Sequence, residues 1–241
     1  MSRLRIVWGI TAVLLSLFTG CVRQIEVGPT QTENLGVEIG EAQSVRATIQ
    51  MGAGELLVRG WATELLDAEF TYNIPEWRPI ITYNVTNGRG ELTISQPEYV
   101  AGPDALPTGN IQYQWDLRFN NEVPLQLEIN LGAGRSDLVL GDLHLTEAQI
   151  NIGVGESTID LTGDWRQSAS ITIEGGIGSA SVRLPANVGV RVVAESGIGT
   201  IEVQDLSSDG ESYTNDLYGQ SEITLEIRVN SGIGTIRLET E

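Results

Sequence analysis

Apolar and polar residues alternate along most of the chain from residue 44 to residue 241, and pairs of glycines interrupt the alternation. In one such segment Leu125, Leu127, Ile129 and Leu131 are separated by polar residues. Strict alternation is typical of a β-strand that buries one face and exposes the other. Because no long segment has helical periodicity, the sequence predicts an all-β fold.

The interruptions repeat one phrase, in which a glycine, a small or aliphatic residue and a second glycine follow each other. The phrase recurs 21 residues after Gly132, at Gly153, and 23 residues later at Gly176. A period of roughly 20–50 residues indicates stacked structural repeats. We predict a single-stranded β-solenoid-like stack with turns of roughly 21 residues, in which glycines form the corners. The predicted corner glycines are Gly52, Gly54, Gly132, Gly134, Gly153, Gly155, Gly176, Gly178, Gly197, Gly199, Gly232 and Gly234.

Two segments depart from the regular period. Gly88-Arg89-Gly90 is interpreted as another early copy of the phrase. The last two copies are 35 residues apart, between Gly197 and Gly232, and the polar residues 207–215 account for the difference. We predict that this insertion is a surface loop between the last two turns.

Composition divides the chain into five segments. We predict a signal peptide at 1–20, a tether at 21–43, a small β sub-domain at 44–100, a linker at 101–109 and the β-repeat domain at 110–241. The tether and the linker are predicted from their prolines, their glycines and their lack of periodicity.

The first 21 residues resemble the signal of a bacterial lipoprotein. Arg3 and Arg5 precede an apolar run, which ends in Leu17-Phe18-Thr19-Gly20-Cys21. This ending is similar to the lipobox, in which the cysteine is diacylated and becomes the new N-terminus. The resemblance implies a lipid anchor at Cys21 on the outer face of a bacterial cytoplasmic membrane. The alternative is an ordinary secretory signal with an incidental cysteine.

Charge limits the range of partners. The net charge is −18, and all fourteen basic residues are arginines. Nucleic acid is excluded as a partner because it requires a basic surface. An acidic surface is also repelled by anionic lipid headgroups.

Residues that could carry chemistry are few. His144 is the only histidine, so we expect neither a zinc site nor a catalytic triad, and we interpret it as an outward-facing strand residue. The glycine pairs lack the third glycine and the following helix of a dinucleotide site. We therefore expect no catalytic residue, no metal and no cofactor, and we predict that the chain is not an enzyme.

Aromatic residues gather in the predicted sub-domain 44–100. Tyr72, Trp77 and Tyr83 are candidates for contact with a partner, because exposed aromatic groups can stack on sugar rings or pack against a protein. The alternative is that they cap the open end of the stack, which must cover its apolar interior.

Several motifs resemble one family of bacterial envelope proteins. Met51-Gly-Ala-Gly-Glu-Leu, Ala68-Glu-Phe-Thr-Tyr-Asn and Trp77-Arg-Pro are similar to the toast-rack N-terminal domain, as are Trp115-Asp-Leu-Arg-Phe and Leu131-Gly-Ala-Gly. The C-terminal repeats resemble adhesin-type domains and the LiaF-type domains of the cell-wall-antibiotic response. The resemblance implies a toast-rack β-stack outside the membrane and a link to envelope stress.

These observations favour a non-enzymatic, lipid-anchored envelope protein that binds or senses. An adhesin or a structural cell-wall scaffold is the alternative, and an enzyme acting on polysaccharide is a third possibility. The expected partners are the membrane, through Cys21, and an envelope protein or cell-wall polymer. The oligomeric state stays open.

Overall fold

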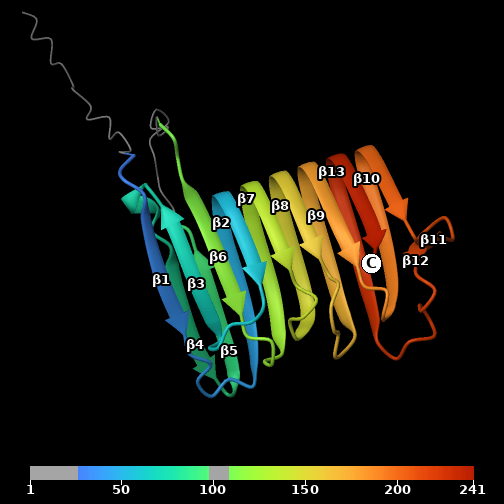
Figure 1. The fold of residues 1–241 in the computed structure, drawn as a ribbon, viewed down its shortest axis with the longest axis horizontal. Coiled ribbons are helices and arrows are strands. Elements are labelled where there is room, and N and C mark those ends of the chain that lie inside the picture. Colours follow the sequence, from blue (N-terminus) through green and yellow to red (C-terminus); the bar gives the residue numbers. More distant parts are fainter. Residues whose placement is uncertain (1–26, 98–108) are drawn as a thin grey trace, which may run out of the picture.

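The computed structural model describes residues 27–97 and 109–241, and apart from one 3₁₀ turn (Pro75–Trp77) its regular structure is β-strand (Figure 1). The predicted signal peptide, Cys21 and most of the predicted linker lie outside the described residues. The strands are β1 (Gln31–Val37), β2 (Ser44–Arg59), β3 (Leu66–Tyr72), β4 (Ile80–Thr86), β5 (Arg89–Ser95), β6 (Tyr113–Phe119), β7 (Leu125–Val139), β8 (Leu145–Asp160), β9 (Ala169–Leu184), β10 (Gly189–Gln204), β11 (Ser207–Ser208), β12 (Tyr213–Thr214) and β13 (Thr224–Thr240).

All thirteen strands belong to one open sheet, which confirms the predicted all-β repeat fold. Its order is β1-β3-β6-β2-β7-β8-β9-β13-β10-β12-β11, with β5 also paired to β2 and β4 paired to β5. We call the six long strands β2, β7, β8, β9, β13 and β10 the rack. Rack neighbours are parallel and in register.

Each rack strand turns back on itself at its glycine corner, so its two halves form two facing layers (Figure 1). The second glycine has a strongly positive φ, for example 145° at Gly178. A Cβ on Gly178 would lie 1.7 Å from the carbonyl oxygen of Gly155 on the neighbouring strand. The first glycine is also crowded, because a Cβ on Gly153 would lie 2.4 Å from the carbonyl oxygen of Gly132. Stacked corners therefore require glycine on steric grounds.

The two layers continue separately beyond β2. Residues 44–50 of β2 pair with β5, and residues 55–59 pair with β6. β5 and β6 both run parallel to β2. β3 and β1 then extend the layer of β6 by antiparallel pairing, and β4 extends the layer of β5 in the same way. The predicted segments 44–100 and 110–241 therefore share one sheet, and their buried side chains form one core cluster.

The core changes composition along the sheet. Leucine, isoleucine and valine fill the rack, whereas Phe70, Trp115 and Phe119 are fully buried between the layers at the N-terminal end. Phe70 and Trp115 pack edge to face, with ring centroids 5.5 Å apart. Large aromatic groups therefore fill the interior at the N-terminal end, where aliphatic groups fill it in the rack.

The last strand of the sequence is not the last strand of the rack. β13 lies between β9 and β10 and pairs with both. Its Ile236 and Leu238 are fully buried, whereas Ile201 and Val203 at the corresponding positions of β10 are only partly buried. The turns therefore do not stack in sequence order at this end, and the last strand of the chain pairs with two neighbours instead of one.

Three shorter segments also differ from expectation. Residues 207–214 are not only a loop, because they form β11 and β12, and β12 pairs with β10 at Arg191 and Val192. Residues 31–37, within the predicted tether, form β1. Gly88 is not a stacked corner, since Asn87 (φ 52°) and Gly88 (φ 77°) form a tight hairpin turn between β4 and β5.

Candidate functional site

Two hollows flank the glycine corner of β2, where the two layers meet. The first, which we call the Trp77 pocket, has a volume of about 490 Å³. It is lined by Ala53, Gly54, Glu55, Thr71, Trp77, Ile111, Gln112, Tyr113 and Gln114. The second, which we call the amide groove, has a volume of about 700 Å³ and crosses β2, β7, β8 and β9 beside their corners.

Aromatic contacts build the Trp77 pocket. Trp77 is half-buried and packs edge to face against Tyr113, with ring centroids 5.5 Å apart. The Tyr113 hydroxyl donates a hydrogen bond of 2.7 Å to the carbonyl oxygen of Trp77. Burial raises the pKa of Tyr113 well above its ordinary value, so the hydroxyl stays neutral and keeps this bond. The exposed remainder of the indole faces a pocket that also contains Ile111, whose side chain is 40% exposed.

A short turn places Trp77 over the end of β3. Pro75 begins the turn, and the Trp77 amide donates to the carbonyl oxygen of Ile74 at 2.9 Å. The next residue, Arg78, donates through Nε to Glu33 of β1 at 2.8 Å, and a second guanidinium nitrogen also bonds this carboxylate. The hydrogen bonds from Arg78 lower the pKa of Glu33. This ion pair ties the turn that carries Trp77 to the neighbouring strand.

The other two candidate aromatics make mainly internal contacts. Tyr72 is buried, with 4% of its surface exposed, and its hydroxyl donates to Glu33 at 3.4 Å. Tyr83 is half-buried, and its hydroxyl donates to the carbonyl oxygen of Ile39 at 2.8 Å. Of the three residues, only Trp77 lines the Trp77 pocket. Tyr72 lines a separate hollow of about 430 Å³, between β1 and the turn that carries Trp77, together with Gln31, Thr32, Glu33, Pro75 and Arg78.

Amide side chains line the second hollow at one position of the repeat, two residues before the first corner glycine. Asn151 donates to Asn130 on the adjacent strand at 2.8 Å. Gln96, just after β5, accepts a hydrogen bond of 2.8 Å from the Gly52 amide. Gln50 and Glu174 occupy the same repeat position on β2 and β9. The result is a row of donors and acceptors beside the apolar Met51, Leu131 and Ile152.

Aligning the repeats by their glycines would have revealed this polar row. Tyr113 could not be found in the same way, because it lies 36 residues from Trp77 and reaches it through the pairing of β3 with β6. Pro75 and Pro79, on either side of Trp77, indicate only that this connection leaves the sheet.

Acidic groups are sparse in both hollows. Glu55 is the carboxylate that lines the Trp77 pocket, and Glu174 lines the groove. Among residues 27–97 and 109–241, no group of three or more His, Cys, Asp or Glu side chains could hold a metal ion. His144 is not a strand residue, as it precedes β8, and its Nδ1 lies 3.0 Å from the carbonyl oxygen of Glu122. Both sites are built for hydrogen bonding and for packing against an apolar surface.

No helix in the described part of the chain is long and apolar enough to cross a membrane.

Comparison with known proteins defines the family. The model of the N-terminal domain of toast_rack matches residues 26–183, and the chain belongs to this family. A second model, of the C-terminal region of the LiaF proteins of the response to cell wall-active antibiotics, matches residues 134–238. The predicted resemblance is therefore confirmed, and both matches extend over the glycine corners.

Solved structures resemble the chain over most of its length. A crystal structure from Clostridium sporogenes ATCC 15579, named as a candidate cell adhesion protein, is 31% identical, with a TM-score of 0.85. The match covers 88% of this chain and 100% of that chain. A candidate adhesin from Bacteroides fragilis NCTC 9343 is 11% identical, with a TM-score of 0.37, and the match covers 87% of this chain and 97% of that chain. No curated protein matches the chain significantly.

Proposed function

We propose that the chain is a non-enzymatic, lipid-anchored protein of the outer face of the bacterial cytoplasmic membrane, and that it binds or senses an envelope component through the Trp77 pocket. The family matches support a place in the response to cell wall-active antibiotics. The anchor is Cys21, and the partner is a cell-wall polymer or an envelope protein. Nucleic acid is not a partner, because the net charge is −18.

One observation carries this proposal, namely the combination of an aromatic face and uncharged polar side chains in the Trp77 pocket. Trp77 offers a partly exposed ring, and Gln112 and Gln114 offer exposed amides. Specific sites are commonly apolar hollows with a few polar groups that fix the orientation of the ligand. The pocket suits a sugar ring or a side chain of a partner protein better than it suits hydrolysis, since a glycosidase requires two facing carboxylates and one carboxylate lines the pocket.

A second candidate function is adhesion or scaffolding. It is favoured by the similarity to the Clostridium sporogenes structure named for cell adhesion. It is also favoured by the outer edge of β10, because residues 200–204 pair with β13 on one side and have no strand on the other among the described residues. A free edge of this kind can accept a strand from a partner.

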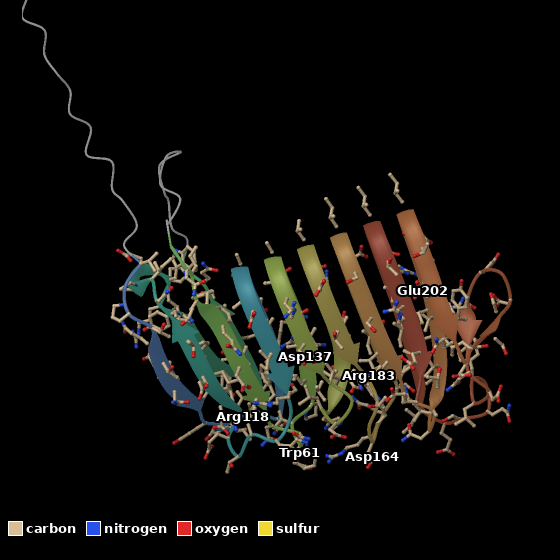
Figure 2. The ribbon with its side chains drawn as sticks, turned by 45° about the horizontal axis from the view of Figure 1, so that its top comes forward. Trp61, Arg118, Asp137, Asp164, Arg183 and Glu202 are labelled. Atoms are coloured by element: carbon tan, nitrogen blue, oxygen red, sulfur yellow. The ribbon has the colours of Figure 1, made fainter. Side chains whose placement is uncertain are left out.

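The test is retention of the soluble chain, lacking Cys21, on isolated cell wall and on solubilised membrane proteins. The test variant is Trp77→Ala, which removes the indole from the pocket. The matched control is Trp61→Ala, because Trp61 is a second, more exposed tryptophan (76%) at the edge opposite the corners (Figure 2). Thermal unfolding checks that both variants are folded.

The proposal predicts that a specific partner is retained by the parent chain and by Trp61→Ala, and that Trp77→Ala loses it at least tenfold. Equal retention of the partner by all three proteins would show that the Trp77 pocket is not the binding site. Retention that disappears with β10-edge substitutions, and not with Trp77→Ala, would favour the adhesion or scaffold function.

A further inference from the structure

An apolar row runs along the outer edge of the rack, where the strands bend. Each corner places one residue between its two glycines, and these residues are in register from strand to strand. From β2 to β10 the corner row is Ala53, Ala133, Val154, Ile177, Ile233 and Ile198. Figure 2 shows side chains that stand beyond the bends of the rack strands.

The four larger side chains of the corner row are exposed although they are aliphatic. Val154 is 50% exposed, Ile177 53%, Ile233 46% and Ile198 69%. At about 4.8 Å per strand, they form a continuous ridge of about 15 Å. Isolated exposed aliphatic residues are common, but a contiguous and ordered row of them marks a contact surface.

From β2 to β10, the residues next to the corner row change from charged to uncharged, while the side chains of the row itself become larger. The residue after the second corner glycine is Glu55, Arg135 and Glu156 on the first three rack strands. On the last three it is Ser179, Thr235 and Thr200, all uncharged. The hydroxyls of Thr200 and Thr235 lie 3.3 Å apart and interact across the strands. The far half of the row is therefore apolar and flanked on this side by small hydroxyl groups.

The chain enters the domain at this same edge. The Gly28 amide donates to the carbonyl oxygen of Asn73 at 2.8 Å, just beyond the end of β3. β3 ends at Tyr72, which pairs with Tyr113, and the carbonyl oxygen of Tyr113 lies beside Gly54 of the β2 corner. Residue 28 is thus at the corner edge. Cys21 precedes Val27 by six residues, which span at most about 20 Å.

We infer that the corner row rests on the lipid bilayer, with Ile177, Ile233 and Ile198 reaching the boundary between headgroups and acyl chains. This inference depends on the lipid anchor at Cys21 in the proposed function. The anchor holds the domain at the β1 end of the edge, and the isoleucines hold it at the β10 end. Two contacts on one edge fix the strands upright on the membrane, and they leave the opposite edge, with Trp61 and Asp164, facing away (Figure 2).

The bilayer fits this surface better than a second copy of the chain does. Attachment through Cys21 keeps the row within reach of the bilayer at a high effective concentration, so a small apolar contact is enough. Two copies, each with a net charge of −18, repel one another at every distance below the Debye length. The same acidity predicts firmer contact with zwitterionic than with anionic lipid.

The test attaches residues 21–241, which include every described residue, to vesicles of phosphatidylcholine through a maleimide lipid. Cys21 carries the only thiol, so coupling is specific and does not require biological lipidation. Tryptophan is introduced by Ile198→Trp in one variant and by Val139→Trp in another. Val139 is 41% exposed at the end of β7, away from the corners, and it is the matched control. Brominated acyl chains quench tryptophan that reaches the hydrocarbon.

The expected result, after subtraction of the parent signal, is that brominated lipid quenches the Ile198→Trp variant at least threefold more than the Val139→Trp variant. Replacing Ile177 and Ile233 by Ser in the Ile198→Trp variant is expected to reduce this quenching at least twofold. Equal quenching of the two variants would overturn the inference. The inference would also be overturned if the uncoupled chain sedimented as a dimer and the two Ser substitutions converted it to a monomer, because the row would then bind a second copy. Mass analysis of Cys21 in bacterial membranes tests the anchor separately.

Discussion

The N-terminal end of the sheet and the rack both bury an apolar interior between two layers, but their strands are arranged differently. At the N-terminal end, antiparallel strands surround Phe70, Trp115 and Phe119. In the rack, parallel strands in register place similar aliphatic residues above one another. The irregular end carries the Trp77 pocket, whereas the regular part repeats one surface at every step. One continuous core therefore supports both the Trp77 pocket, which occurs once, and the corner row, which repeats on every rack strand.

The largest effect is expected from removing β13 by ending the chain after Ser221. β13 lies inside the rack, so its loss separates β9 from β10 and exposes the core residues that Ile227, Val229 and Leu238 cover. We expect the truncated chain to lose cooperative urea unfolding and to expose apolar surface to a hydrophobic dye. A truncated chain that unfolds cooperatively, as expected if the last turn were only the end of the stack, would contradict the strand order.

Gly178→Ala tests the steric basis of the rack. The new Cβ would overlap the carbonyl oxygen of Gly155, and φ at this position is 145°. We expect destabilisation of more than about 4 kcal/mol in urea unfolding, because the stacked corners cannot separate without breaking the ladder. Gly219→Ala is the control. Gly219 also has a positive φ, of 78°, but nothing lies within 4 Å, so the cost is expected to be about 1–2 kcal/mol. Equal costs would show that backbone strain, and not stacking, sets the requirement.

Trp115→Ala compares the aromatic end with the rack. The side chain is fully buried, and we expect a loss of about 3–5 kcal/mol. Ile150→Val removes one methylene from the buried rack core and is expected to cost about 0.5–1.5 kcal/mol. Because the core is continuous, both variants should shift one common transition in circular dichroism and in tryptophan fluorescence. Two separate transitions would mean that the ends fold independently.

The smallest effect is expected at the ion pair between Glu33 and Arg78. Arg78 lowers the pKa of Glu33 below the ordinary value of 4.5, so the ionised carboxylate stabilises the fold. This contribution is complete above pH 4.5 and is lost as the pH falls through the lower folded value. Glu33→Gln should therefore be slightly less stable than the parent at neutral pH, and the difference should shrink below pH 4.5. A difference that grows in acid would contradict this sign.

The repetitive features of the molecule were predictable from sequence, because each is set by local chemistry. Alternation along residues 125–131 predicts a strand, and the crowding at Gly153 and Gly178 explains why the phrase repeats. The position of β13 was not predictable. β10 and β13 carry the same glycine phrase and the same alternation, so either strand could pair with β9 in register. The longer interval before Gly232 indicated only that the last turn is unusual.

The site was partly predictable for a similar reason. Trp77 was identified as a candidate because it is one of the aromatic residues that gather in segment 44–100 and could stack on a sugar ring or a partner. Its pocket also requires Tyr113 and Ile111, and these residues reach it only because β6 pairs with both β2 and β3. Tyr72 is buried because it alternates in phase with Phe70 on β3, and its aromatic character alone does not reveal this.

Site-specific photocrosslinking in the bacterial envelope tests the central claim most directly, namely that the N-terminal end binds and the rack supports it. A photoreactive phenylalanine analogue replaces Ile111, which is exposed in the Trp77 pocket, or Ser208, which is exposed on β11 at the other end of the sheet. We predict a specific adduct from position 111 that disappears with Trp77→Ala, and none from position 208. An adduct from position 208 alone, or equal adducts from both positions, would contradict this account.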